Sequence, residues 1–399
     1  MLLAKFALAG ALMAAGTVSG HLVQDRAAVA PSQILPTFRA ELNRPAPDFQ
    51  LKDTDGKSWR LADLKGQVVV LEWYNPDCPV VREAHGTEGV LRTLGNRVGR
   101  MENATWLAIN SGAEGQQGHG LERNKRSRGE YSIEYPVLLD ETGVVGRAYG
   151  ATTTPHLYII DAAGTLVYMG GHADRKGGDL IAPAVEAALA GNRPEPGRTP
   201  NRGCSVKYPT TATLGCVAPA FELSDLNDKV YRSNELLGKI VVLEWFNPLC
   251  PVVEAAHDTG ILKHQAAELT RSGQVVWMAI NSGHKADPSA SRTNNLEAIK
   301  KWSLGHPLLM DTSGRVGKAY DARVTPTTYV LDAHGRVMYI GGPGDGEHPY
   351  VKEVVTRLLK GEPVEPTRTE AQGCSVKYAK EEEKGAEAGA EKGERPERK

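Results

Sequence analysis

The chain has 399 residues, a formal net charge of -1 and 41% apolar residues, which is enough for two domains of ordinary size. A charge this close to neutral gives no reason to expect a nucleic acid or an acidic membrane surface as a partner. Five cysteines are too few for a disulfide-built scaffold in a chain of this length, and their odd number implies at least one free or intermolecular thiol.

The N-terminus has the pattern of a secretory signal peptide over residues 1–20. Lys5 precedes an apolar run from Phe6 to about Val18, and the small residues Ser19 and Gly20 follow. The run is short for a membrane span. An uncleaved membrane anchor is the alternative to a cleaved signal peptide. No cysteine follows the run, so a lipid anchor is not expected. We therefore expect an exported protein, periplasmic or extracellular, in a compartment where disulfides persist.

Most of the remaining sequence is duplicated. Segments 70–85 and 242–257 are identical at 12 of 16 positions, and shorter motifs recur in the same order at nearly the same offset. A period this long indicates a duplicated domain rather than a solenoid. We place the two domains at 41–208 and 215–378, with a leader at 21–40 and a linker at 209–214. The charged tail at 379–399 is expected to be disordered.

Extended and helical segments alternate within the first copy. The sequence predicts a hairpin over 49–59, a buried strand over 67–73, a helix over 79–94, a strand over 105–109 and a helix over 122–131. A short strand at 136–139, a short helix at 144–149, a hairpin from 156 to 169 and a last helix at 179–189 follow. This order predicts an α/β fold in which a central mixed sheet is flanked by helices in each domain.

A cysteine stands at the start of an expected helix in each copy. The unsatisfied N–H groups and the positive dipole end of a helix N-terminus favour the thiolate, which is the nucleophilic form. Cys78 and Cys250 occupy this place, and each is followed by a proline that fixes the helix start. They are the candidate nucleophiles.

An acidic residue lies six positions before each cysteine, inside an apolar strand. Burial of Glu72 and Glu244 would raise the pKa of each carboxyl group, and such an acid could carry a proton to and from a nearby thiol. The alternative is that both glutamates are exposed at a strand edge.

A Thr-Pro pair precedes a strand in each copy, at Thr154-Pro155 and Thr325-Pro326. Proline suits the start of a strand because it cannot donate to a sheet, and it pushes the preceding residue into extended geometry. A cis peptide bond here would leave an open backbone edge beside the thiol, whereas an ordinary trans-proline turn is the alternative.

Together these residues resemble the thioredoxin fold, and in particular the redoxins of the alkyl hydroperoxide reductase/thiol-specific antioxidant family, in a tandem duplication. Segments 45–51 (Pro-Ala-Pro-Asp-Phe-Gln-Leu) and 217–223 (Val-Ala-Pro-Ala-Phe-Glu-Leu) resemble the opening of that family. The resemblance implies attacking cysteines, buried acids and cis-prolines, and these roles fall on Cys78, Cys250, Glu72, Glu244, Pro155 and Pro326.

The sequence departs from these relatives around the cysteine. Val81 and Val253 replace the second cysteine of the thioredoxin pair, so the usual dithiol is absent. Asn75 and Asn247 stand where the peroxide-reducing relatives carry a threonine that binds the peroxide.

The segment that closes each copy offers a second thiol. Both segments read Gly-Cys-Ser-Val-Lys-Tyr, at 203–208 and 373–378. We expect the tail cysteine, Cys204 or Cys374, to fold back and resolve the helix cysteine of its own domain, which requires Cα atoms within roughly 7 Å. A buried or structural thiol is the alternative.

Cys216 has no counterpart in the other copy, where the aligned residue is Arg44. It is the expected odd thiol, although a Cys204–Cys216 bridge is a competing pairing.

Other polar patterns are interpreted as structural. Seven residues of helix separate His85 from Cys78 by about 10 Å, so His85 and His257 are expected to be surface or core residues rather than thiol partners. Copper-delivering relatives carry a second cysteine where Arg82 and Glu254 stand, so no metal site is expected. The basic run 123–128 is expected to be a solvated helix face.

Three functions fit this pattern. The first is an exported redoxin acting in thiol–disulfide exchange, in which the helix cysteine attacks a substrate disulfide. The second is a thiol-dependent peroxidase with a distal resolving cysteine, and the third is a non-catalytic binding or scaffold module. The expected partners are protein or small-molecule thiols and disulfides, and peroxides for the second function; no cofactor, nucleic acid or membrane beyond the signal segment is expected.

Overall fold

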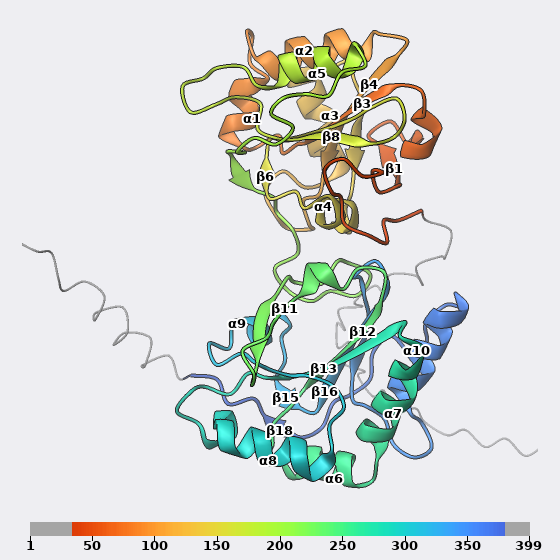
Figure 1. The fold of residues 1–399 in the computed structure, drawn as a ribbon, viewed down its shortest axis with the longest axis vertical. Helices are drawn as coiled ribbons and strands as arrows, with labels where there is room; N and C mark the ends of the chain where they lie inside the picture. Colours follow the sequence, from red (N-terminus) through yellow and green to blue (C-terminus); the bar gives the residue numbers. More distant parts are fainter. Residues whose placement is uncertain (1–33, 380–399) are drawn as a thin grey trace, which may run out of the picture.

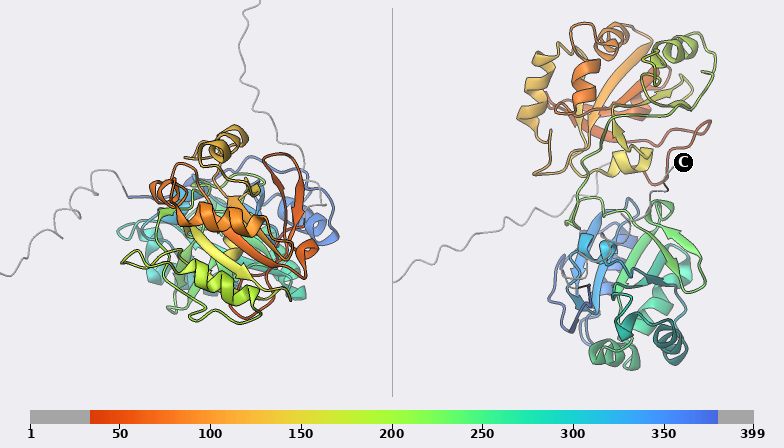
Figure 2. Two further views of the ribbon diagram at one scale, coloured as in Figure 1. Left: turned by 90° about the horizontal axis from the view of Figure 1, so that it is seen from above. Right: turned by 90° about the vertical axis from the view of Figure 1, so that its left-hand side faces the viewer.

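A computed structural model describes residues 34–379. The expected signal peptide, most of the leader and the tail beyond Ala379 lie outside the described residues. The described chain forms two bodies joined by a narrow segment (Figures 1 and 2). Within these residues, no helix has the length and apolar character needed to cross a membrane.

The first body is built on a seven-stranded sheet with the order β2-β1-β5-β4-β3-β7-β8. Its strands are β1 (Gln50–Asp53), β2 (Ser58–Arg60), β3 (Val68–Trp73), β4 (Ala104–Asn110), β5 (Val137–Leu139), β7 (His156–Ile160) and β8 (Leu166–Gly170). The pairs β3–β4 and β4–β5 are parallel and the other pairs are antiparallel, so the sheet is mixed, as predicted.

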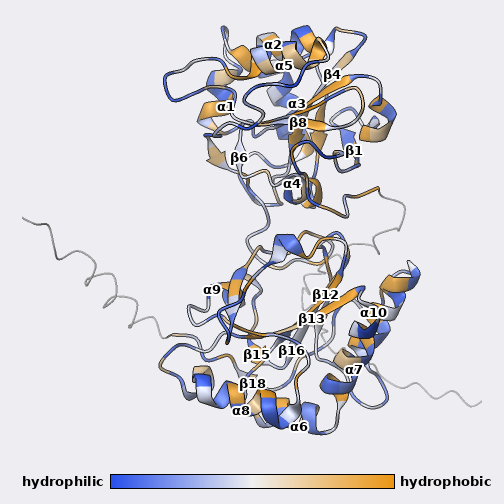
Figure 3. Ribbon diagram, in the orientation of Figure 1, coloured by the Kyte–Doolittle hydropathy of each residue, from blue (hydrophilic) through white to orange (hydrophobic). Residues whose placement is uncertain are grey.

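Helices cover both faces of this sheet. On one face lie α1 (Pro79–Ala84), α2 (Val90–Gly99) and α5 (Ile181–Leu189), packed with Val68 and Val70, and on the other lies α4 (Val144–Tyr149), packed with Val69 and Leu71. Because side chains alternate along β3, a single apolar strand supplies both cores. Figure 3 shows the apolar residues gathered in the central strands. α3 (Leu121–Glu130) connects β4 to β5.

The second body repeats this architecture with the order β11-β10-β14-β13-β12-β16-β17. Its strands are β10 (Glu222–Asp225), β11 (Val230–Arg232), β12 (Ile240–Trp245), β13 (Val275–Asn281), β14 (Leu308–Met310), β16 (Thr327–Leu331) and β17 (Val337–Gly341). Its helices are α6 (Pro251–Asp258), α7 (Ile261–Leu269), α8 (Arg292–Trp302), α9 (Arg315–Ala319) and α10 (Tyr350–Lys360). Short 3-10 helices occur at η1 (Leu61–Leu64), η2 (Ser233–Glu235), η3 (Thr270–Ser272) and η4 (Pro288–Ala290). The duplication in the sequence is therefore a duplication of fold.

Each body also carries a two-stranded pairing that the sequence did not predict. β6 (Thr153–Thr154) pairs with β9 (Cys204–Ser205), and β15 (Val324–Thr325) pairs with β18 (Cys374–Ser375). These short pairings bring the end of each domain to the Thr-Pro segment.

The single helix predicted over 79–94 is wrong. The chain forms α1 and α2 instead, and the break contains Gly89, where an added Cβ would lie 2.2 Å from the carbonyl oxygen of Ala84. In the second body, the break falls at Gly260, whose φ of +84° favours glycine. A glycine thus stands at the start of the second helix in both copies.

Candidate active site

The helix cysteine lies buried against the Thr-Pro segment in each body. Cys78 is the N-cap residue of α1, and its thiol donates to the carbonyl oxygen of Thr154 at 3.0 Å. Cys250 is the N-cap residue of α6 and donates to Thr325 O at 3.2 Å. The peptide bonds before Pro155 and Pro326 are cis, so the expected cis form is confirmed and the trans alternative is wrong.

The tail cysteine lies directly beside the helix cysteine. Antiparallel pairing of β9 with β6 sets Cys204 opposite Thr154, whose carbonyl oxygen contacts the sulfur of Cys78, so the two thiols are close enough to shift each other's pKa. The second body repeats this contact between Cys374 and Cys250. The structure therefore brings together the two thiols that the sequence analysis paired, both in the reduced form.

The structure contains neither disulfide, but it favours Cys78 over Cys216 as the neighbour of Cys204. Cys216 lines a different, small pocket together with Pro209 and Thr213, whereas the Cys204 thiol contacts Cys78. The contacts therefore favour the pairing of Cys204 with Cys78 over the pairing with Cys216.

The Gly-Cys-Ser-Val-Lys-Tyr motif contains the residues that position the tail cysteine. Gly203 has a φ of +148°, and an added Cβ would lie 2.0 Å from the carbonyl oxygen of Thr154, so only glycine permits this approach. The hydroxyl of Tyr208 donates at 2.8 Å to a backbone carbonyl in the loop before β6. Gly373 and Tyr378 make the equivalent contacts. The motif therefore allows the tail segment to lie close to the Thr-Pro segment, a role that the sequence alone did not reveal.

The two sulfurs of each pair differ in acidity. Burial raises the pKa of Cys78, but hydrogen bonds from the Cys204 thiol and from the Val81 amide outweigh burial, and the pKa lies below its ordinary value. The hydrogen bond to Cys78, followed by burial, raises the pKa of Cys204. The pKa of Cys250 is lowered and that of Cys374 raised in the same way. In each pair, the helix cysteine is therefore the more acidic thiol and the tail cysteine the less acidic one.

Both glutamates are completely buried, so the exposed strand-edge alternative is wrong. The carboxylate of Glu72 accepts from Trp106 Nε1 at 3.0 Å and lies 3.2 Å from His85 Nε2. Among the hydrogen bonds of the described residues, none joins Glu72 to Cys78. The acid therefore binds a core histidine and a tryptophan, rather than the thiol.

The raised pKa predicted for Glu244 is wrong. Burial does raise it, but the charge and hydrogen bond of His257, with Nε2 at 3.1 Å, outweigh burial and lower the pKa below its ordinary value. In the first body, burial lowers the pKa of His85, but the charge of Glu72 outweighs burial and raises it. Each core therefore contains a Glu–His ion pair, which the sequence analysis missed although both copies keep the same spacing of 13 residues.

The basic run is not simply a solvated helix face. Arg123 Nε donates to Asp77 Oδ1 at 2.8 Å, which ties α3 to the loop that carries Cys78, and Asn124 and Ser127 of the same run are buried. Leu249 occupies the place of Asp77 in the second body and is 53% exposed. The two sites thus share their sulfur geometry but differ in the polarity of the adjoining loop.

Metal binding finds no support in the described part of the chain. Between residues 34 and 379, histidine, cysteine and acidic side chains do not gather in any group of three or more that could hold a metal ion.

The fold and the site define a tandem thioredoxin-like protein with a pair of cysteines in each domain. The sequence model of the AhpC/TSA family matches residues 42–169 and again residues 214–340. The chain belongs to the AhpC/TSA family, with one copy in each domain, and the resemblance stated from the motifs is confirmed.

Relatives of described activity include the thiol-disulfide oxidoreductase ResA of Geobacillus thermodenitrificans, which is 26% identical over 131 residues. That match spans 33% of this chain and 70% of the relative. ResA of Bacillus subtilis is 29% identical over 128 residues, spanning 32% and 65%. A solved structure, a hypothetical protein from Sinorhizobium meliloti, matches with 27% identity and a TM-score of 0.38, over 42% of this chain and 94% of its own.

Proposed function

We propose that each domain catalyses thiol–disulfide exchange, with the helix cysteine and the tail cysteine as its redox couple: Cys78 with Cys204, and Cys250 with Cys374. The observation that carries the proposal is that both cysteines of a pair lie against the same threonine, in both domains although their surrounding loops differ. The helix cysteine's sulfur contacts the threonine's carbonyl oxygen, and the tail cysteine lies opposite that threonine in a two-stranded pairing. The similarity to ResA proteins, which are named thiol-disulfide oxidoreductases, supports the same chemistry.

The couple works by moving two electrons between the protein and its substrate. When it reduces a disulfide, the substrate's S–S bond breaks, a bond forms between the two cysteine sulfurs, and their protons pass to the departing thiols. When it oxidises thiols, the same steps run backwards. The lowered pKa of Cys78 gives it a larger thiolate fraction than an ordinary cysteine, and the thiolate is the form that exchanges.

The other predicted site residues act by positioning the couple. The cis-prolines Pro155 and Pro326 each follow the threonine whose carbonyl oxygen contacts the helix cysteine. Glu72 and Glu244 each bind the histidine at the end of the cysteine's helix, and so tie that helix to the central strand. They act as positioning residues rather than as proton carriers.

Peroxide reduction is less well supported. The side chain of Asn75 is engaged by two backbone groups: it accepts from the Asp77 amide of its own loop at 2.9 Å and donates to Gln117 O, in the loop between β4 and α3, at 3.2 Å. Cys78 itself is fully buried beneath the tail segment. A non-catalytic scaffold would have no need for the sulfur contact, which both domains keep.

Export remains a proposal from the sequence. The apolar run at 1–20 and the use of cysteine pairs both suit an oxidising compartment.

The test compares two oxidants of the reduced protein. We expect glutathione disulfide to convert each pair to an intramolecular disulfide, and hydrogen peroxide at equal concentration to act at least about tenfold more slowly. Replacing both Cys78 and Cys250 by serine should abolish formation of the intramolecular disulfides and leave Cys204 and Cys374 able to form only mixed disulfides with glutathione. Rapid sulfenic acid formation by peroxide would instead support the peroxidase, and thiols inert to both oxidants would support the scaffold.

A further inference from the structure

The two sulfurs of each pair differ in their access to solvent. Cys78 is 0% exposed and Cys250 is 1% exposed. Cys204 and Cys374 are only half-buried, because β9 and β18 lie on the outer side of the helix cysteine when they pair with the Thr-Pro segment. The tail cysteine is therefore the outer member of each pair.

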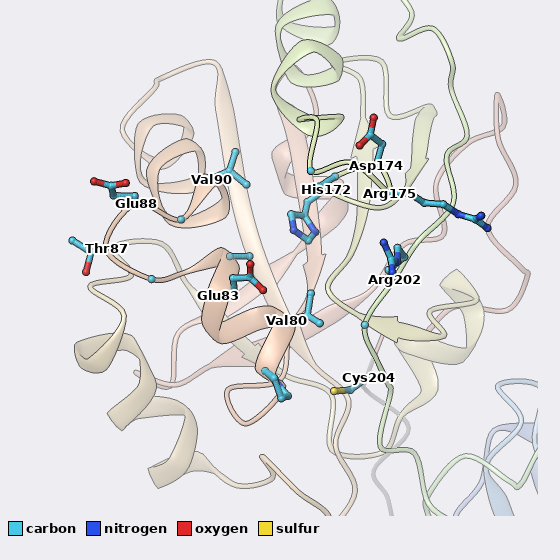
Figure 4. A pocket seen from close by; sticks show the side chains of 17 residues that line it. Val80, Glu83, Thr87, Glu88, Val90, His172, Asp174, Arg175, Arg202 and Cys204 are labelled. Atoms are coloured by element: carbon cyan, nitrogen blue, oxygen red, sulfur yellow. The ribbon is translucent and has the colours of Figure 1, made fainter.

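In the first domain, a groove of about 880 Å³ leads to the outer sulfur. Its walls come from α1 and the loop after it, from the loop after β8, and from the segment just before β9. Figure 4 shows Cys204 at one end of the groove, with Val80 and Arg202 next along it and His172 farther away. Cys78 does not line the groove. A compound that enters it therefore reaches the sulfur of Cys204 first.

We propose that the outer sulfur, Cys204 in the first domain and Cys374 in the second, is the atom that exchanges bonds with an external thiol or disulfide, and that the groove receives this substrate at Cys204. The proposal rests on the redox couple proposed above. It reverses the order expected from the sequence, in which the helix cysteine attacks first and the tail cysteine resolves.

The oxidised couple can react with an external thiolate in a step that accounts for every bond and electron pair. The thiolate attacks the sulfur of Cys204, a mixed disulfide forms between substrate and Cys204, and the Cys78–Cys204 bond breaks. Cys78 departs with the bonding electron pair as a thiolate, and the amide of Val81 stabilises it by a hydrogen bond. Attack expels the more acidic thiol faster, so this direction of cleavage is also the favoured one.

A second thiolate then completes the turnover. It attacks the substrate sulfur of the mixed disulfide, and Cys204 leaves and takes up a proton. The net result is the oxidation of two external thiols to a disulfide and the reduction of the protein couple to a dithiol. Reduction of an external disulfide follows the same path in reverse, with the mixed disulfide again on Cys204.

The first experiment maps the mixed disulfide in the wild-type protein. The couples are oxidised, exposed briefly to glutathione, quenched with acid, and digested for mass spectrometry. We expect glutathione on Cys204 and Cys374, with Cys78 and Cys250 as thiols. Glutathione on Cys78 or Cys250 would overturn the proposal. An oxidised protein without a Cys78–Cys204 bond would instead refute the proposed function, so the two failures are distinguishable.

The second experiment tests whether solvent access or thiol acidity decides which cysteine of the pair reacts faster. In a background where Cys216, Cys250 and Cys374 are serine, Cys78→Ser and Cys204→Ser are compared for reaction with 5,5′-dithiobis(2-nitrobenzoate). Acidity alone would make Cys78, in the Cys204→Ser variant, the faster thiol. We expect Cys204, in the Cys78→Ser variant, to react at least about tenfold faster because it is accessible.

The control repeats both reactions in guanidinium chloride, where the difference should disappear. Equal rates in the folded proteins, or a faster Cys204→Ser variant, would contradict the proposal.

Discussion

At the scale of single residues, one sulfur–sulfur contact explains the opposite acidities of the two cysteines. The same hydrogen bond lowers the pKa of Cys78 and raises that of Cys204. The Val81 amide is one of the N–H groups that the sequence analysis expected at the helix start, and the Cys204 thiol adds a second donor that the helix itself does not supply.

Replacing Cys204 by alanine should therefore raise the pKa of Cys78. The thiolate loses a hydrogen-bond donor, and each unit of the rise corresponds to about 1.4 kcal/mol. The pKa is measured from thiolate absorbance in a background without Cys216, Cys250 and Cys374. Adding Cys204→Ser to the same background is the matched control, because serine keeps a donor and should shift the pKa less. A pKa that stays unchanged or falls in the alanine variant would contradict this account.

Replacing Gly203 by alanine should disturb the couple without touching either sulfur. The added Cβ would meet the carbonyl oxygen of Thr154 at 2.0 Å, and the φ of +148° is unfavourable for alanine, with a cost of about 1–3 kcal/mol. We expect slower formation of the Cys78–Cys204 disulfide and greater exposure of Cys78 to alkylation. Gly129→Ala is the control, since no atom lies within 4 Å of its added Cβ. Equal disulfide rates for both variants would argue against a close-approach role.

At the scale of elements, strands were easier to predict than the contacts at their ends. Apolar runs such as Val68–Trp73, interrupted only by Glu72, predicted the central strands and the α/β class, because a strand buried on both faces is apolar at nearly every position. The helix break at Gly89 was missed because the steric conflict with Ala84 depends on the folded backbone. The pairing of β6 with β9 was missed because two-residue strands carry no periodicity.

The Glu–His pair shows the same limit. Its constant spacing was visible in the sequence, but an ion pair between β12 and α6 depends on how the helix packs on the sheet. The inferred pKa of Glu244 was wrong because burial was considered without its partner.

Replacing His257 by leucine should destabilise the second domain most at neutral pH. The pKa of Glu244 lies below its ordinary value of 4.5, so the pair's stabilisation is fully present above pH 4.5 and is lost as the pH falls through the folded-state pKa. Removing one partner of a buried pair costs about 3–5 kcal/mol. The loss, measured by denaturant unfolding, should shrink towards acid pH. His264→Leu, at an exposed position on α7, is the control, and a loss independent of pH would contradict the assignment.

At the scale of the whole molecule, the duplication provides two complete couples on one chain. The pairing β15–β18 repeats β6–β9, so each domain closes its own site with its own tail segment. The sequence predicted this organisation because the repeated motifs keep their order, and it predicted the cysteine pairs from the matching end segments. The sequence left both Cys78 and Cys216 open as the partner of Cys204. The choice between them required the contacts of the folded structure.

The two couples should therefore act independently. Cys78→Ser should leave the second domain able to form one disulfide, and Cys250→Ser should leave the first domain able to do the same. Mass spectrometry after oxidation with glutathione disulfide counts the intramolecular disulfides and distinguishes them from mixed disulfides at the remaining tail cysteine. Loss of both disulfides in either variant would show that the domains depend on each other.

The central claim is that the tail cysteine of each domain is the redox partner of its helix cysteine. The most direct measurement is a mass-spectrometric map of the disulfides in the oxidised wild-type protein. The account predicts the linked pairs Cys78–Cys204 and Cys250–Cys374. A Cys204–Cys216 bridge, a bond between the two domains, or persistent thiols at these four positions would contradict it.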